Sequence, residues 1–108
     1  MSRKPTQKDI VFRSEQLRRA VASLECMHCG LEGSTQASHS NQSRDGRGIG
    51  HKTSDAFLAA LCFKCHHEVD YSHTLNREEK LDVWENAYRR TIRALLERGL
   101  LIVDRSKI

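Results

Sequence analysis

Hydrophobic residues recur with a helical period in two parts of the chain. Near the start, Leu17, Val21 and Leu24 share one helical face, and Ser14 stands where an N-cap is expected. The second segment begins at a capping-box sequence from Asn76 to Glu79 and ends at Gly99. Its apolar stripe consists of Leu81, Trp84, Tyr88, Ile92 and Leu95. We therefore expect a short N-terminal helix and a long C-terminal helix that packs on the rest of the domain.

Two short segments between these helices have the character of strands. They are residues 36–39 and the apolar residues 56–61. The loop between them, residues 40–55, shows neither a helical nor a strand periodicity of apolar residues. A loop of that length is usually functional or disordered. A further helix is expected from about Lys64 to Tyr71, which gives an α+β arrangement. For the apolar tail at residues 100–103, a small strand, a docking segment and a dimer contact all stay open.

The length and charge of the chain limit the classes of protein to consider. With 108 residues and 6% aromatics, we expect one domain over residues 14–108 that gains from a structural metal, preceded by a flexible basic arm at residues 1–13. The net charge of +4 favours a polyanionic partner without proving one. No apolar run approaches the ~18 residues that span a bilayer. No apolar segment follows the basic N-terminus as in a secretory signal, so we expect a cytoplasmic protein.

The strongest chemical signal is a set of four cysteines in two Cys-x2-Cys pairs. They are Cys26, Cys29, Cys62 and Cys65. Thiols stay reduced in the cytoplasm, and this spacing is typical of a tetrahedral zinc site, so zinc is favoured over two disulfides. Four thiolates close the coordination shell, and this Zn²⁺ would therefore be structural. His28, inside the first pair, could replace a cysteine, although four thiolates already suffice.

A second group of residues suggests a different metal. His66 and Asp70 are spaced i, i+4 on the helix expected after the second cysteine pair, so they share a face. An imidazole and a carboxylate make half of a site for Mg²⁺ or Mn²⁺, and a solvated intrahelical pair is the alternative. His39 ends the first expected strand, where a hairpin would bring it near the second cysteine pair. It could act as a general base near neutral pH.

The long loop carries the basic residues that we expect beside phosphates. They are Arg44, Arg47, His51 and Lys52. His51 could also assist His39 as the base, whereas His73 is expected to be exposed on the surface. One metal and one histidine are enough for phosphodiester hydrolysis, because the histidine takes a proton from water while the metal stabilises the leaving oxygen.

These residues fall in a pattern that resembles the HNH (ββα-metal) endonuclease superfamily, and more narrowly small phage- and prophage-encoded nucleases of the YbcO type. The matching runs are Ala37-Ser38-His39, Gly48-x-Gly50-x-Lys52, Asp55, and Cys62-x2-Cys65-His66-x-Glu68-Val69-Asp70. The resemblance covers about residues 14–99, and residues 26–70 carry most of its specificity. It implies a zinc-stapled ββα-metal, treble-clef-like core, metal-dependent cutting of DNA, and the cytoplasm of a bacterial host cell.

The resemblance also implies roles for single residues. His39 matches the general base, His66 a ligand of the catalytic metal, and Asp70 a second ligand in several branches. Two positions depart from the pattern. Ser38 stands where an Asp or His often helps to hold the metal, and Phe57 stands where the middle Asn is expected. Asp55 or Asn41 would then orient the base, and the sequence does not choose between them.

Three functions follow from these observations. The first is a metal-dependent DNA endonuclease in phage or prophage DNA processing or recombination. The second is a zinc-stabilised nucleic-acid-binding module without catalysis. The third is an adaptor that binds a partner through its C-terminal helix. A homodimer stays open as well, because a nuclease this small often needs two copies to cut both strands.

Overall fold

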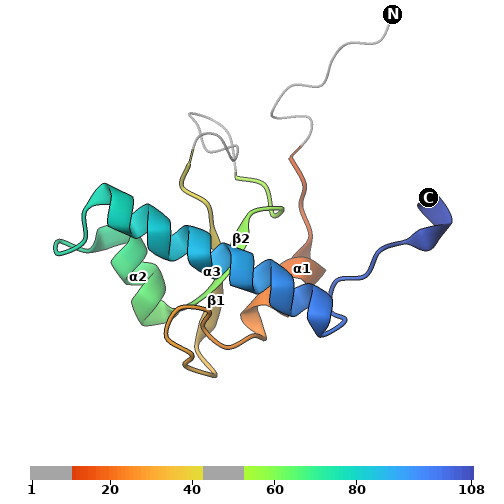
Figure 1. Cartoon of the computed structure of the whole chain (residues 1–108), viewed down its shortest axis with the longest axis horizontal. Coiled ribbons are helices and arrows are strands. Elements are labelled where there is room, and N and C mark those ends of the chain that lie inside the picture. Colours follow the sequence, from red (N-terminus) through yellow and green to blue (C-terminus); the bar gives the residue numbers. More distant parts are fainter. Residues whose placement is uncertain (1–10, 43–52) are drawn as a thin grey trace, which may run out of the picture.

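The computed structural model describes residues 11–42 and 53–108. In chain order its elements are α1 (Glu15–Ala22), β1 (Thr35–His39), β2 (Leu58–Cys62), α2 (Phe63–Tyr71), α3 (Arg77–Glu97) and a short 3-10 helix, η2 (Arg105–Lys107). Figure 1 shows α3 running across the two strands, with α1 and α2 beside it. The predicted α+β class and element order are confirmed, with boundaries that differ by one or two residues.

Local sequence explains where α1 begins and where α3 begins and ends. The Ser14 hydroxyl accepts a hydrogen bond from the Leu17 N–H at 3.1 Å, which caps α1. Asn76 and Glu79 exchange both hydrogen bonds of a capping box at the start of α3. Gly99 follows α3 with a φ of 71°, the left-handed conformation that glycine adopts without steric cost.

The register of the sheet decides which side each strand residue faces. β1 and β2 pair antiparallel, from Thr35 opposite Cys62 to His39 opposite Leu58. Residues directly opposite one another in such a pair share a face, and neighbours along a strand alternate. Ser38, opposite Ala59, therefore faces one side of the two-stranded sheet, and His39 faces the other.

Helices cover both faces of β2, which is why this strand is buried along its whole length. The cluster on the α2 side contains Ala59, Leu61, Cys65, Val69, Trp84 and Ala87. The cluster on the α1 side contains Val21, Leu24, Leu58, Ala60, Ala94 and Leu95. Since α3 contributes to both clusters, it connects the two halves of the core.

The buried face of α3 is rotated from the predicted stripe. Leu81, Tyr88 and Ile92 are only partly buried, whereas Ala87, Thr91 and Ala94 are buried. Small residues here let α3 approach β2 closely. The Thr91 hydroxyl accepts a hydrogen bond from the Ala60 N–H at 2.9 Å and donates to the Ala87 carbonyl at 2.7 Å. The apolar period alone missed this face because its residues are small or polar.

The segment of the first cysteine pair is attached to both β2 and α3. The Met27 N–H donates to the Ala60 carbonyl at 2.8 Å, and Arg90 donates to the Met27 carbonyl at 3.1 Å. Arg98 donates two hydrogen bonds to Glu25, at 2.8 and 2.6 Å. The hydrogen bond from Arg98 lowers the pKa of Glu25 to about 2.

The two ends of the described chain differ in how they are held. Phe12 and Arg13, at the end of the predicted arm, contact the segment before β2 through hydrogen bonds to the Asp55 N–H and the Thr53 carbonyl. Residues 1–10 of that arm lie outside the described residues. Residues 100–103 are exposed and form neither helix nor strand, so the strand considered for them is not observed.

Among the described residues, no helix is both long enough and apolar enough to cross a membrane.

Candidate functional site

The four predicted cysteine ligands lie together at the junction of the first pair, β2 and α2. All four sulfur atoms lie within 4.8 Å of one another, and the sulfurs of Cys29 and Cys62 are 3.7 Å apart. In a tetrahedral zinc site with Zn–S bonds of about 2.3 Å, the sulfurs would be about 3.8 Å apart. All four cysteines are free of disulfides. They could therefore hold a metal ion such as zinc, while His28 is exposed and outside the cluster.

The surroundings of the sulfurs differ in their effect on ionisation. Burial would raise the pKa of Cys26, but backbone N–H groups of Cys29, Cys62 and His28 oppose it and hold that pKa at about 6. Burial and the neighbouring sulfurs raise the pKa of Cys65 above its ordinary value. One sulfur is thus prepared as a thiolate, and a cation is needed to stabilise several thiolates together.

His39 is paired with Asp55, which arrives from the segment before β2. The Nε2 atom of His39 lies 2.7 Å from Oδ1 of Asp55, whose side chain is fully buried. The same carboxylate accepts hydrogen bonds from the Ser14 N–H, from Arg13 and from Arg18. Burial would raise the pKa of Asp55, yet these hydrogen bonds and the charge of Arg18 hold it below its ordinary value. The carboxylate is therefore ionised at neutral pH.

His66 and Asp70 form the expected pair on α2. Nε2 of His66 lies 3.3 Å from Oδ2 of Asp70, and both side chains are about a quarter exposed. Nδ1 of His66 lies 2.8 Å from the Gln36 side-chain oxygen on β1. Oδ1 of Asp70 accepts a hydrogen bond from the Asn41 amide at 2.7 Å. The pair is therefore tied to β1 and to the segment that follows it.

The two pairs lie on opposite faces of the sheet. We expected the hairpin to bring His39 near the second cysteine pair, and this expectation is wrong. The register places His39 opposite Leu58, at the far end of β2 from Cys62. His39 instead lies at the end of β1 from which Asn41 reaches Asp70. Residues 39–41 consequently connect both pairs.

The structure separates the two candidates for orienting the base. Asp55 contacts His39, whereas Asn41 contacts Asp70. Phe57, at the place of the middle Asn, offers its carbonyl to the Ser40 N–H at 3.1 Å. Ser38 is buried, and within the described segments its hydroxyl oxygen has no hydrogen-bond partner.

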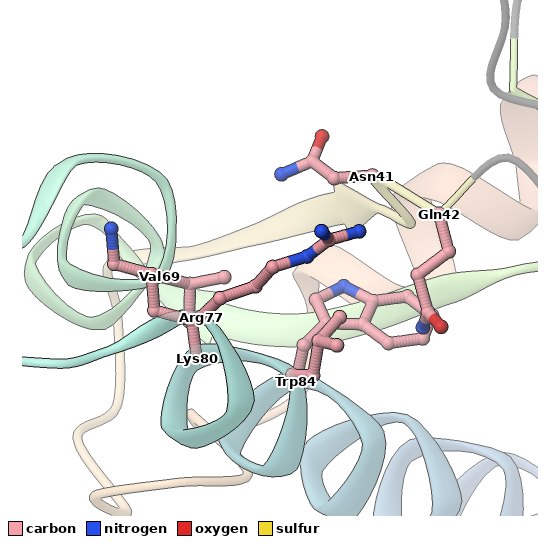
Figure 2. A pocket seen from close by; sticks show the side chains of 7 residues that line it. Asn41, Gln42, Val69, Arg77, Lys80 and Trp84 are labelled. Carbon is pink, nitrogen blue, oxygen red and sulfur yellow. The ribbon is translucent and has the colours of Figure 1, made fainter.

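Sequence reasoning missed several residues around these pairs. Arg13 and Arg18 were not expected to bind Asp55, because their contacts span about 40 positions of sequence. Arg77 and Lys80 line a cavity beside Asn41 (Figure 2), and their i, i+3 spacing with Trp84 four residues further on was the available signal. The predicted phosphate-binding residues Arg44, Arg47, His51 and Lys52 lie outside the described residues. His73 is exposed, as expected.

Comparison with known proteins gave no relative. No family model, no curated protein and no solved structure matches this chain. The function must therefore be argued from the geometry of the site itself.

Proposed function

We propose that this chain is a metal-dependent endonuclease of the HNH type that hydrolyses phosphodiester bonds in DNA. The observation that supports it best is the junction at residues 39–41. There His39 bonds Asp55, and Asn41 bonds Asp70, the i, i+4 partner of His66. The candidate base and the candidate metal pair lie on opposite faces of the sheet, and residues 39–41 link them at the end of β1. The resemblance of the sequence to phage and prophage HNH nucleases suggests that the enzyme acts in phage or prophage DNA processing or recombination.

The contact with Asp55 supports His39 as the general base. Because Asp55 stays ionised, its Oδ1 accepts a hydrogen bond, and Nε2 of His39 carries the proton. Nδ1 then keeps its lone pair and can accept a proton from the attacking water. Asp55 would also fix the orientation of the His39 ring. In the HNH pattern this role belongs to the middle Asn, and Phe57 at that position cannot perform it.

The spacing of His66 and Asp70 fits a divalent ion. Two adjacent ligands of an octahedral Mg²⁺ at about 2.1 Å would lie about 3 Å apart, and the observed N–O distance is 3.3 Å. A Mg²⁺ or Mn²⁺ ion held there would stabilise charge on the scissile phosphate and on the leaving oxygen. Ser38 faces the same side of the sheet, and its buried hydroxyl lacks a partner among the described residues, so it could serve as a weak further ligand.

The four-cysteine cluster supports a separate structural role. A Zn²⁺ ion on four thiolates has no open position for water or substrate. It would hold the first cysteine pair against the end of β2 and the start of α2, in the manner of a treble-clef-like core. A zinc ion held there would fix the start of α2, which carries His66 and Asp70.

A second function has one specific observation in its favour. Among the described residues, the four cysteines are the only group that brings three or more potential metal ligands together. His66 and Asp70 contribute only two protein ligands, which favours a zinc-stabilised nucleic-acid-binding module without catalysis. The adaptor hypothesis loses support, because Trp84 and Leu95 of the α3 stripe are buried in the protein's own core.

Cutting of supercoiled plasmid DNA in Mg²⁺ or Mn²⁺ separates these functions. We expect the parent to cut and His39→Ala to lose about 10²–10⁴-fold in rate. His73→Ala, which removes an exposed histidine, is the matched control and should cut like the parent. Retardation of DNA without cutting in either metal would overturn the nuclease and favour the binding module. Normal cutting by His39→Ala would show that another group is the base.

A further inference from the structure

A cavity of about 430 Å³ lies between α2, α3 and the segment that follows β1. Its lining consists of Asn41, Gln42, Val69, Arg77, Lys80, Leu81 and Trp84. Figure 2 shows side chains from all three segments around the cavity, with the Arg77 guanidinium near Trp84 and Asn41 and the Lys80 amine pointing away from it toward α2. The cavity therefore combines an apolar wall with two cations and two amides.

The two cations are available for a ligand. In the described part of the chain, the side chains of Arg77 and Lys80 take part in no hydrogen bond or ion pair. Two carboxylates are hydrogen-bonded to amides of the lining, since Asp70 accepts from Asn41 at 2.7 Å and Glu85 accepts from Gln42 at 2.8 Å. Cations without an ion-pair partner in a concave site attract anions.

The chemistry of the wall narrows the class of anion. The partly buried Leu81 presents apolar surface beside the cations, and the core residues Val69 and Trp84 reach the cavity only with small exposed parts. A free phosphate ion has nothing to place against such a surface, whereas a sugar–phosphate unit has both a charged and an apolar part. The cavity therefore suits a nucleic-acid backbone better than an inorganic ion.

The cavity adjoins the candidate metal pair. The Asn41 amide both lines the cavity and donates to Asp70, and Val69 of the wall precedes Asp70 on α2. Because Asn41 belongs to both, a strand with its scissile phosphate at His66 and Asp70 would extend toward the cavity that Arg77 and Lys80 line.

We infer that this cavity binds the sugar–phosphate backbone of a DNA strand next to the bond that is cut, with Arg77 and Lys80 contacting two of its phosphates. The position relative to the cut bond rests on the proposed function. The binding itself does not, because it would also serve a module without catalysis.

Fluorescence anisotropy with labelled single-stranded and duplex DNA, without added Mg²⁺ or Mn²⁺, measures this binding without cutting. The test variant combines Arg77→Ala with Lys80→Ala. The control combines Arg89→Ala with Arg93→Ala, which removes equal charge from exposed positions of the same helix. We expect the dissociation constant of the test variant to rise about tenfold or more. The log–log slope of its salt dependence should weaken by about 1.8 with duplex DNA and about 1.4 with single-stranded DNA, for two lost phosphate contacts. The control should change less than about threefold.

Other outcomes would overturn the inference. Equal losses in both double variants would mean that only overall charge matters, and unchanged binding by the test variant would exclude the cavity. Inorganic phosphate that competes as well as unlabelled DNA at equal phosphate concentration would identify a free-phosphate site instead. Equal melting curves and zinc contents for both double variants exclude misfolding as the cause.

Plasmid cutting separates the two proposals. A parent that never cuts, together with a test variant that loses binding, would overturn the nuclease and support the cavity. A test variant that binds and cuts DNA like the parent would support the nuclease and overturn the role of the cavity.

Discussion

The Nε2 atom of His39 lies 2.7 Å from Oδ1 of Asp55, although the two residues are 16 positions apart in the sequence. The carboxylate also accepts hydrogen bonds from the Ser14 N–H and from Arg13 and Arg18. The start of α1, the end of β1 and the segment before β2 therefore meet at one buried charge. Asp55 is expected to matter for both folding and chemistry.

Asp55→Asn should lower the free energy of unfolding at neutral pH by about 1.5–3 kcal/mol, the range for hydrogen bonds to a charged group. The amide cannot balance Arg13 and Arg18, and it cannot hold the same tautomer of His39. Urea denaturation followed by circular dichroism measures the loss. Asp82→Asn, at an exposed position of α3, is the matched control and should be close to neutral. Equal stability of the two variants would contradict the role given to this carboxylate.

The contribution of Asp55 to stability should also depend on pH. Its pKa in the folded protein lies below the ordinary value of 3.8. A carboxyl group whose pKa is lowered by folding stabilises the fold above its unfolded pKa, and this contribution disappears as the pH falls through the folded pKa. The stability difference between the parent and Asp55→Asn should therefore be constant near neutrality and shrink below about pH 4. A difference that stays constant down to pH 2 would contradict the lowered pKa.

Cys62→Ser should unfold the domain, because binding of zinc to four thiolates contributes directly to folding in so small a protein. Cys62 is buried, and its sulfur is 3.7 Å from that of Cys29. We expect the parent to carry one zinc per chain and the variant to lose both the zinc and the cooperative melt. Metal analysis and circular dichroism measure the two effects. A variant that melts like the parent would contradict a structural zinc.

Asp70→Ala should leave the fold intact and weaken only the binding of the second metal. The side chain is about a quarter exposed, and its partners are His66 and Asn41. We expect the melting temperature to change by only a few degrees, as for a solvent-accessible contact. Titration with Mn²⁺ should show weaker binding than in the parent or in Asp82→Ala. Collapse of the variant would mean that Asp70 is structural and that the two sites are not separate.

Thr91→Val keeps the shape of the side chain and removes the hydroxyl that accepts from the Ala60 N–H. A buried N–H left without a partner costs about 1–3 kcal/mol, which corresponds to a melting temperature lower by about 4–24 °C. Thr74→Val, at an exposed position, should melt within a few degrees of the parent. An unchanged melt for Thr91→Val would mean that the Ala60 N–H finds another partner.

Features with a local cause could be predicted from the sequence. The caps at Ser14 and Asn76 depend on residues within three positions, and both are observed. The cysteine cluster follows from two short spacings that a hairpin brings together. The i, i+4 pair of His66 and Asp70 needed only a helix.

Features that depend on the pairing of distant segments could not be predicted. A shift of one residue in the register of β1 and β2 would exchange the faces of Ser38 and His39, and no local pattern fixes that register. Thr91 is polar and does not stand out in an apolar period, yet it is buried where α3 meets β2. The cavity at Arg77 and Lys80 also exists only once α2, α3 and β1 are assembled.

The contacts of Ala60 have a consequence for what happens when metal is scarce. Among the described residues, β2 has a strand partner on one side only. On its outer edge the Ala60 N–H and carbonyl are occupied by Thr91 and by the Met27 N–H. Met27 lies inside the first cysteine pair, so the loop that zinc would organise also covers this edge. An uncovered strand edge is a template for pairing with another chain. Metal starvation would therefore drive this protein toward aggregation through β2, and zinc supply would set its solubility as well as its fold.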